Sequence, residues 1–181
     1  MRRAMPILTR RLSLTPFDSA AVRDQLNGDP KFFKRLGLPP RRDWPPPLYD
    51  ADAMRWVLRR LEEGDDPRWH VHVVATRGRF LRRARALGVA GFKGPPDSVG
   101  EVEIGYSIVA NEQRRGVCSE AVDALLRFAF EDPRVALVSA HTLSSDATAA
   151  SRRVLESANF FGPFLTEENG VVRYERPRES L

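Results

Sequence analysis

With 181 residues and 42% hydrophobic content, the chain is long enough for one buried core and short for two, so we expect a single domain over residues 1–181. No apolar run approaches the roughly 20 residues of a membrane helix, and the single cysteine, Cys118, excludes an intrachain disulfide and a cysteine-based zinc site, so we expect a soluble, cytoplasmic protein without a metal. The formal net charge of +5 would suit nucleic acid, but the basic residues are spread along the whole chain, so nucleic-acid binding is kept only as the weaker alternative and no membrane partner is expected.

The first half of the chain predicts a β-α-α-β opening. Alternating apolar and polar residues indicate strands, apolar residues at helical spacing indicate amphipathic helices, and clustered prolines exclude both. The proline-rich stretch is expected to be a loop that walls a substrate pocket, because loops on a rigid scaffold often carry specificity. The elements expected are a strand at 7–15, a helix to about Leu26 capped by Asp18 or Ser19, a loop at 31–49 with at most a short helix at 32–36, a helix at 50–63 capped by Asp50 or Asp52, and a strand at 69–76.

Two histidines in the last of these strands, His70 and His72, share one face. That spacing would suit a metal, but no third ligand is evident in the sequence. We therefore expect that both histidines are either satisfied by protein groups or exposed.

The second half predicts the order β-β-α-β-α-β-β. The run at 135–143 is the most continuously apolar, so we expect a central strand buried on both faces. The elements expected are a basic turn at 77–85, strands at 87–92 and 101–110, a helix from Val117 to about Asp132, the strand at 135–143, a helix to about Ser157 capped by Asp146 or Thr148, and a hairpin of 160–165 with 171–176.

The most informative stretch is 113–121, QRRGVCSEA, which joins the strand at 101–110 to the following helix. It places a basic turn with one glycine at a helix N-terminus, where unpaired N–H groups and the helix dipole favour an anion. A phosphate-bearing ligand is the first hypothesis. A plain solvated loop is the alternative.

The order of elements, with the Q-x-x-G turn between a strand and a helix, resembles the GCN5-related N-acetyltransferase (GNAT) superfamily. It is most similar to the branch that acetylates the N-termini of ribosomal proteins. The acyl-CoA motif of the family is Q/R-x-x-G-x-G/A, which residues 113–118 match except at Cys118; Ser119-Glu120-Ala121 then resembles the T-E-A of the branch, and 150–156 resembles its A-S-x-x-V-L-E helix.

The resemblance implies a three-layer α/β fold with a mostly antiparallel sheet of about seven strands, splayed in a V, and about four helices. Three positions depart from the pattern of the branch. Cys118 replaces a Gly or Ala, Thr148 replaces an Asn, and Asn159 replaces a Gly before Phe160.

The resemblance also implies that acetyl-CoA is the cosubstrate. On this view the backbone of 114–119 binds the pyrophosphate, and the main chain of 108–110 holds the pantetheine. The residues expected to bind acetyl-CoA are Ile108, Val109, Ala110, Gln113, Arg114, Arg115, Gly116, Val117, Cys118, Ser119 and Thr148.

The activity so implied is transfer of the acetyl group to a primary amine, of a protein N-terminus or a small molecule, by direct attack in a ternary complex. Transfer needs a neutral amine and a protonated thiolate. Glu103 is the candidate base with Glu101 as its rival, and a solvated glutamate is the structural alternative. Many members of the superfamily use a tyrosine as acid where this chain has Leu155, so Ser151 is the substitute, with a helix hydroxyl bonded to the preceding turn as its alternative.

Cys118 offers a covalent route, since a helix N-terminus lowers the pKa of a thiol. Its motif position is at the phosphates, away from the acyl group, which disfavours that route. A module that binds CoA without turnover is the second functional hypothesis. The chain is expected to be a monomer or homodimer, and the acceptor amine is expected to contact the 31–49 loop and the C-terminal hairpin.

Overall fold

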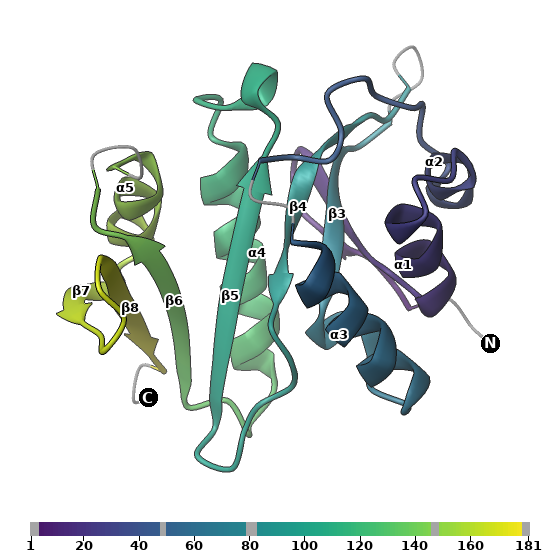
Figure 1. Cartoon of the computed structure of the whole chain (residues 1–181). Coiled ribbons are helices and arrows are strands. Elements are labelled where there is room, and N and C mark those ends of the chain that lie inside the picture. The colour runs from purple at the N-terminus through teal and green to yellow at the C-terminus, as the bar shows by residue number, and fades with distance from the viewer. Residues whose placement is uncertain (1–3, 48–49, 79–82, 146–148, 179–181) are drawn as a thin grey trace.

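The computed structural model describes residues 4–47, 50–78, 83–145 and 149–178. Its centre is one eight-stranded sheet with the order β1-β2-β3-β4-β5-β6-β8-β7 (Figure 1). All neighbouring strands are antiparallel except β5 and β6, which confirms the mixed α/β fold with a mostly antiparallel sheet. The strands are β1 Ile7–Leu8, β2 Leu12–Pro16, β3 Val71–Thr76, β4 Ala86–Phe92, β5 Glu101–Ile108, β6 Leu137–Leu143, β7 Phe161–Leu165 and β8 Val171–Pro177.

The expected first strand at 7–15 is in fact two strands, which accounts for eight strands in place of about seven. Thr9 turns the chain back, because its hydroxyl oxygen accepts the Leu12 N–H at 2.8 Å and its own N–H bonds to the Leu12 carbonyl at 2.9 Å. β1 and β2 then pair antiparallel. The rough alternation over 7–15 predicts a single strand and does not reveal that the consecutive polar residues 9–11 form a turn.

Within the described residues five α-helices surround the sheet, where about four were expected; the additional one is the short helix α2 in the proline-rich segment. Two expected caps are confirmed: the Asp18 carboxylate accepts the Ala21 N–H at 2.7 Å, and Asp50 accepts the Asp52 N–H at 2.8 Å. The caps expected at Asp146 or Thr148 lie outside the described residues. Within the described ranges, no helix has the length and apolar character needed to cross a membrane. The helices are α1 Ser19–Leu26, α2 Lys31–Leu36, α3 Ala51–Glu62, α4 Val117–Glu131 and α5 Ala149–Ser157, with 3-10 turns at Pro67–Trp69 and Ala110–Glu112.

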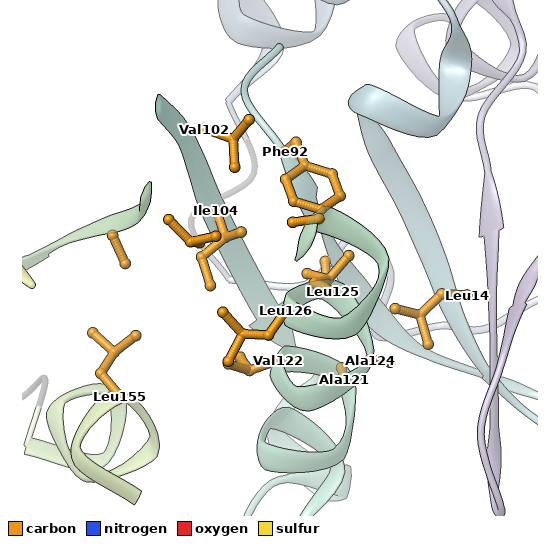
Figure 2. Close-up of a cluster of buried hydrophobic side chains, with 14 of the residues drawn as sticks. Leu14, Phe92, Val102, Ile104, Ala121, Val122, Ala124, Leu125, Leu126 and Leu155 are labelled. Carbon is orange, nitrogen blue, oxygen red and sulfur yellow. The ribbon is translucent and has the colours of Figure 1, made fainter. Parts of the chain in front are cut away.

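The two faces of the sheet carry two separate cores. Helices α1, α2 and α3 pack on the β3–β4 part of one face, and α4 and α5 lie on the opposite face (Figure 1). Leu125 of α4 lies at the centre of the second core, near Phe92 of β4 (Figure 2). Among the described helices none covers β5, β6 and β8 on the α1–α3 side, so that part of the sheet is an open face.

The strands β5 and β6 separate part of the way along their length, as the resemblance implied. They pair only from Glu101 to Glu103 and from Leu137 to Ser139. The expectation that the β6 strand is buried on both faces is therefore wrong for its second half, where His141 and Leu143 are exposed. This half, residues 141–143, lines the gap between β5 and β6 and does not fill a core.

His70 and His72 are both fully buried, and one ring nitrogen of each contacts a protein group, while the other ring nitrogen has no partner among the described residues. The Nε2 atom of His70 lies 2.9 Å from the Asp65 carboxylate, and the Nδ1 atom of His72 lies 2.9 Å from the His70 carbonyl oxygen. In the part of the chain that the structure describes, no cluster of three His, Cys, Asp or Glu side chains could hold a metal ion.

Candidate active site

A cleft of about 1160 Å³ opens where β5 and β6 separate. Its volume exceeds the roughly 300–1,000 Å³ of typical small-molecule sites. Side chains alternate along a strand, so consecutive lining residues such as Tyr106 and Ser107 show that the cleft reaches both faces of the sheet. The lining residues are Pro47, 104–108, 112–114, 116–119, 140–143, Ala150, Ser151, Arg153, Val154, Glu168 and Val171.

One end of the cleft is the loop at 113–116 and the first turn of α4. Arg114 and Gly116 have positive φ angles of 59° and 70°, and the Gln113 side chain fixes the loop by donating to the Ile108 carbonyl at 2.8 Å. Gly116 precedes α4, and no side chain caps the helix. The first N–H groups of α4 are therefore available to an anion, as the sequence predicted.

The loop is held from outside the cleft by Arg11 of the β1–β2 turn. The guanidinium donates to the Arg115 and Gly116 carbonyls at 3.1 Å each, and its Nε atom contacts the Glu120 carboxylate of α4. Glu120 also accepts the Arg11 backbone N–H at 2.9 Å and the Thr9 hydroxyl. These bonds point the loop carbonyls toward Arg11, which leaves the N–H groups for the cleft.

A second charged group, Glu112, lies beside the loop and is only 4% exposed. Three arginines surround its carboxylate: Arg85 contacts it directly, Arg115 lies at 3.5 Å and Arg41 at 3.6 Å. Of the two arginines expected to add charge to the phosphate site, Arg114 lines the cleft, whereas Arg115 is paired with Glu112.

The edges of β5 and β6 that face each other lack a strand partner beyond Glu103 and Ser139. Backbone N–H and C=O groups on these edges can bond an extended ligand in the cleft. Ile108 lines the cleft, but Val109 and Ala110 are not among the lining residues described, and the Val109 N–H is bonded to the Leu87 carbonyl at 3.0 Å.

The predicted acidic residues lie at the apex of the V. Glu103 is beside the cleft without being one of its described lining residues; its carboxylate contacts Lys93 and lies 2.9 Å from the His141 Nδ1 atom. Glu101 accepts from Arg173 at 2.8 Å and from the Ser139 hydroxyl at 2.6 Å. These bonds, the Arg173 guanidinium first, hold the pKa of Glu101 below its ordinary value, so Glu101 is a poor proton acceptor.

Ser151 lies in the wall opposite, on α5. Its hydroxyl is 3.0 Å from the Tyr106 hydroxyl of β5, and both residues line the cleft. Burial raises the pKa of Tyr106 to about 12, so the phenol stays protonated and can donate. The sequence gives no local sign of the roles of Tyr106, Arg11 and His141, because their contacts join residues that are far apart in the chain.

Most of the other residues expected to bind acetyl-CoA line the cleft. Gln113, Arg114, Gly116, Val117, Cys118 and Ser119 line the cleft, and Thr148 lies outside the described residues.

Cys118 differs from expectation, because burial raises the pKa of its thiol to about 11 in place of the lowering that a helix N-terminus would give. At pH 7.5 the thiolate is therefore scarce. We expect iodoacetamide to alkylate the folded protein about 100-fold more slowly than the same protein in urea, where the thiol pKa is about 8.5. Since the chain has one cysteine, mass spectrometry gives the rate directly. Equal rates at pH 7.5 would restore the reactive-thiol hypothesis.

Comparison with known proteins identifies the family. The chain matches the family model of the acetyltransferase (GNAT) domain over residues 11–160. It is 24% identical over 153 residues to YjdG, an uncharacterized N-acetyltransferase of Bacillus subtilis strain 168, which covers 84% of this chain and 87% of that protein.

Solved structures agree on the fold. RimL, a ribosomal L7/L12 alpha-N-protein acetyltransferase, superposes with a TM-score of 0.61 and 17% identity, over 98% of this chain and 99% of that one. The microcin C7 self-immunity acetyltransferase MccE, solved with acetyl-CoA and AMP, gives a TM-score of 0.60 and 14% identity over 94% of each chain. The family match spans most of the chain and the same fold recurs in these acetyltransferases, so this protein belongs to the GNAT acetyltransferase family.

Proposed function

We propose that the protein transfers the acetyl group of acetyl-CoA to a primary amine by direct attack in a ternary complex. The observation that carries this proposal is the cleft itself. It runs between two strands that part at Glu103 and Ser139, and it has an uncapped helix N-terminus at one end. One ligand can enter from the α4 side and a second from the open face.

The residues present fit acetyl-CoA, which supplies an activated acyl thioester. The N–H groups at 117–119 and the side chain of Arg114 would hold the pyrophosphate. The unpaired edge of β5 as far as Ile108 would bond the pantetheine amides. Cys118 at the loop does not obstruct this arrangement, because its side chain is small and partly buried.

Two proton transfers accompany the reaction. The carboxylate of Glu103 at the apex is within reach of a proton released by the amine, directly or through a neighbouring group. Ser151, bonded to the protonated Tyr106 hydroxyl, can protonate the departing thiolate. A thiol with a pKa of about 8.5 is a tolerable leaving group, so this second transfer is a modest aid.

Calorimetric titration with acetyl-CoA, followed by a screen of amines for thiol release, tests the function. Saturable binding and release of free CoA with at least one amine are expected. Binding without turnover on peptides, polyamines and aminoglycosides would favour a non-catalytic CoA-binding module, and absence of binding would refute the proposal. Salt-sensitive binding of RNA or DNA in place of CoA would favour the nucleic-acid alternative.

Ser151→Ala is expected to lower kcat about tenfold and leave the affinity for acetyl-CoA unchanged, since only protonation of the thiolate is impaired. Tyr106→Phe should have a similar effect, because it removes the hydroxyl bonded to Ser151. Ser157→Ala is the matched control on α5, where the hydroxyl is exposed and bonds the Arg153 carbonyl at 2.6 Å. Steady-state kinetics of Ser151→Ala that match those of Ser157→Ala would remove Ser151 from the mechanism.

A further inference from the structure

The apex of the V brings together polar side chains that are far apart in the sequence. Glu103 is the last residue of β5 that pairs with β6, and its partner is Ser139. His141 follows two residues later on β6 and therefore lies on the same face as Ser139 and Glu103. That face is the open one, from which the acceptor amine would enter.

His141 is placed between Glu103 and the cleft. Its Nδ1 atom lies 2.9 Å from the Glu103 carboxylate. His141 lines the cleft, whereas Glu103 is not among the described lining residues. The imidazole geometry puts Nε2 on the far side of the ring from Nδ1. Within the described part of the chain no group bonds to Nε2, which leaves it to a ligand.

Other charged groups face this end of the cleft. Lys93 contacts the same Glu103 oxygen and offsets its charge. Arg173 of β8 lies opposite His141 in the sheet, but its guanidinium is bonded to Glu101 at 2.8 Å and to another carboxylate, that of Glu175, at 2.7 Å. The remaining charged groups that line the cleft are Glu112, Arg114, Arg153 and Glu168.

We propose that His141 is the catalytic base of the reaction and that Glu103 is a positioning residue that acts through it. This inference rests on the proposed function. As the amine nitrogen forms its bond to the acyl carbon, its proton passes to His141 Nε2, the carbon–sulfur bond breaks, and the electron pair leaves on sulfur. The thiolate then takes a proton, the products are the amide and free CoA, and His141 returns its proton to water.

As a chemical class, an imidazole accepts a proton more readily than a carboxylate. An α-amine has a pKa of about 8, a free imidazole about 6.5 and a free glutamate about 4.3. General base catalysis is most efficient when the base titrates near the working pH. Glu103 is also engaged by Lys93, whereas His141 faces the cleft directly.

The kinetic test compares His141→Gln, Glu103→Gln and the control Glu175→Gln, with spermidine and the tripeptide Ala-Ala-Ala as acceptors. We expect His141→Gln to lower kcat about 100-fold at pH 7 and Glu103→Gln about tenfold, with the affinity for acetyl-CoA within twofold of the parent. The loss should shrink as pH rises and more of the amine is neutral. Glu175→Gln should match the parent, because Glu175 is not among the described residues of the cleft.

A parent rate in His141→Gln from pH 6 to 9 would overturn the assignment while leaving the acetyltransferase proposal intact. Loss of acetyl-CoA binding in parallel with the rate would also overturn it, since His141 would then be structural. Failure of the unmodified protein to bind acetyl-CoA refutes the proposed function itself, so the two failures are distinguishable.

An NMR measurement decides the positioning role without turnover. The chain has three histidines, and His70 and His72 are buried, so the imidazole ¹⁵N signals of His141 are assigned by their loss in His141→Gln. Acetyl-CoA should move these signals, and Glu103→Gln should move that of Nδ1, while the signals of the buried pair stay fixed. Unchanged His141 signals in Glu103→Gln would overturn the inference even if neither acceptor is turned over.

Discussion

Replacing Arg11 by methionine should weaken acetyl-CoA binding about tenfold, although Arg11 lies outside the cleft. The guanidinium bonds to the Arg115 and Gly116 carbonyls and to Glu120, and thereby fixes the loop whose N–H groups we propose bind the pyrophosphate. Methionine keeps much of the apolar stem and removes these bonds. If acetyl-CoA binds at this loop as we propose, the freed loop must be ordered on binding, and a tenfold loss corresponds to about 1.4 kcal/mol.

Glu120→Gln should have a smaller effect in the same direction, and the double variant should lose less than the sum of the two single losses. Burial alone would raise the pKa of Glu120, but bonds from Thr9 and Arg11 hold that pKa below its ordinary value. The carboxylate is therefore charged at neutral pH and belongs to one unit with Arg11, for which non-additive effects are the rule.

Arg23→Met is the matched control, since Arg23 pairs with Glu62 on the surface between α1 and α3. Calorimetry should give it the parent dissociation constant. If Arg11→Met also binds acetyl-CoA with parent affinity, the loop holds its conformation without the Arg11 hydrogen bonds and the prediction is wrong. Urea unfolding of each variant separates a binding effect from a loss of folded protein.

Leu125→Ala should lower the free energy of unfolding by about 3–4 kcal/mol, the largest expected effect on stability. Leu125 is 0% exposed at the centre of α4 and packs toward the sheet (Figure 2). The substitution removes apolar contacts and leaves a cavity. Helix α4 cannot move to close this cavity, because its other side chains pack against the sheet and α5. Figure 2 shows Phe92 and Leu126 beside it in the same cluster.

Leu165→Ala makes the same chemical change at a position that is 92% exposed. Its free energy of unfolding should stay within about 0.5 kcal/mol of the parent. Urea unfolding, monitored by circular dichroism, measures both free energies. The dependence of the free energy on urea concentration should be equal for the two variants if their denatured states are alike. A loss below about 1 kcal/mol for Leu125→Ala would show that the α4 core repacks freely.

Much of the fold could be predicted from the sequence, because strand and helix periodicities are local properties. The alternation in EVEIGYSI marked β5, and the capping carboxylates of Asp18 and Asp50 marked the starts of two helices. The errors have two causes. The turn at Thr9, closed by local bonds to Leu12, divides the expected first strand, and the second half of β6, residues 141–143, borders a cleft because β5 and β6 part there.

For the candidate site, the residues that are consecutive in the sequence were predicted and those that only folding brings together were not. The 113–119 loop was predicted because an anion site at a helix N-terminus is made by consecutive residues. Arg11, Tyr106 and His141 were missed, because each acts on a partner that only chain folding brings near. Even the pKa of Cys118 followed its burial and not its place in the motif.

By itself the sequence determined the order of strands and helices apart from the division into β1 and β2, the loop at 113–116 before a helix N-terminus and, through its motifs, the family resemblance. Each depends on residues within a few positions of one another, so the linear order is sufficient. Only the tertiary structure decided where β5 and β6 part, that Arg11 and Glu120 brace the loop, and that His141 stands between Glu103 and the cleft. Those features depend on strand register and helix packing, which fix distances between residues remote in the chain.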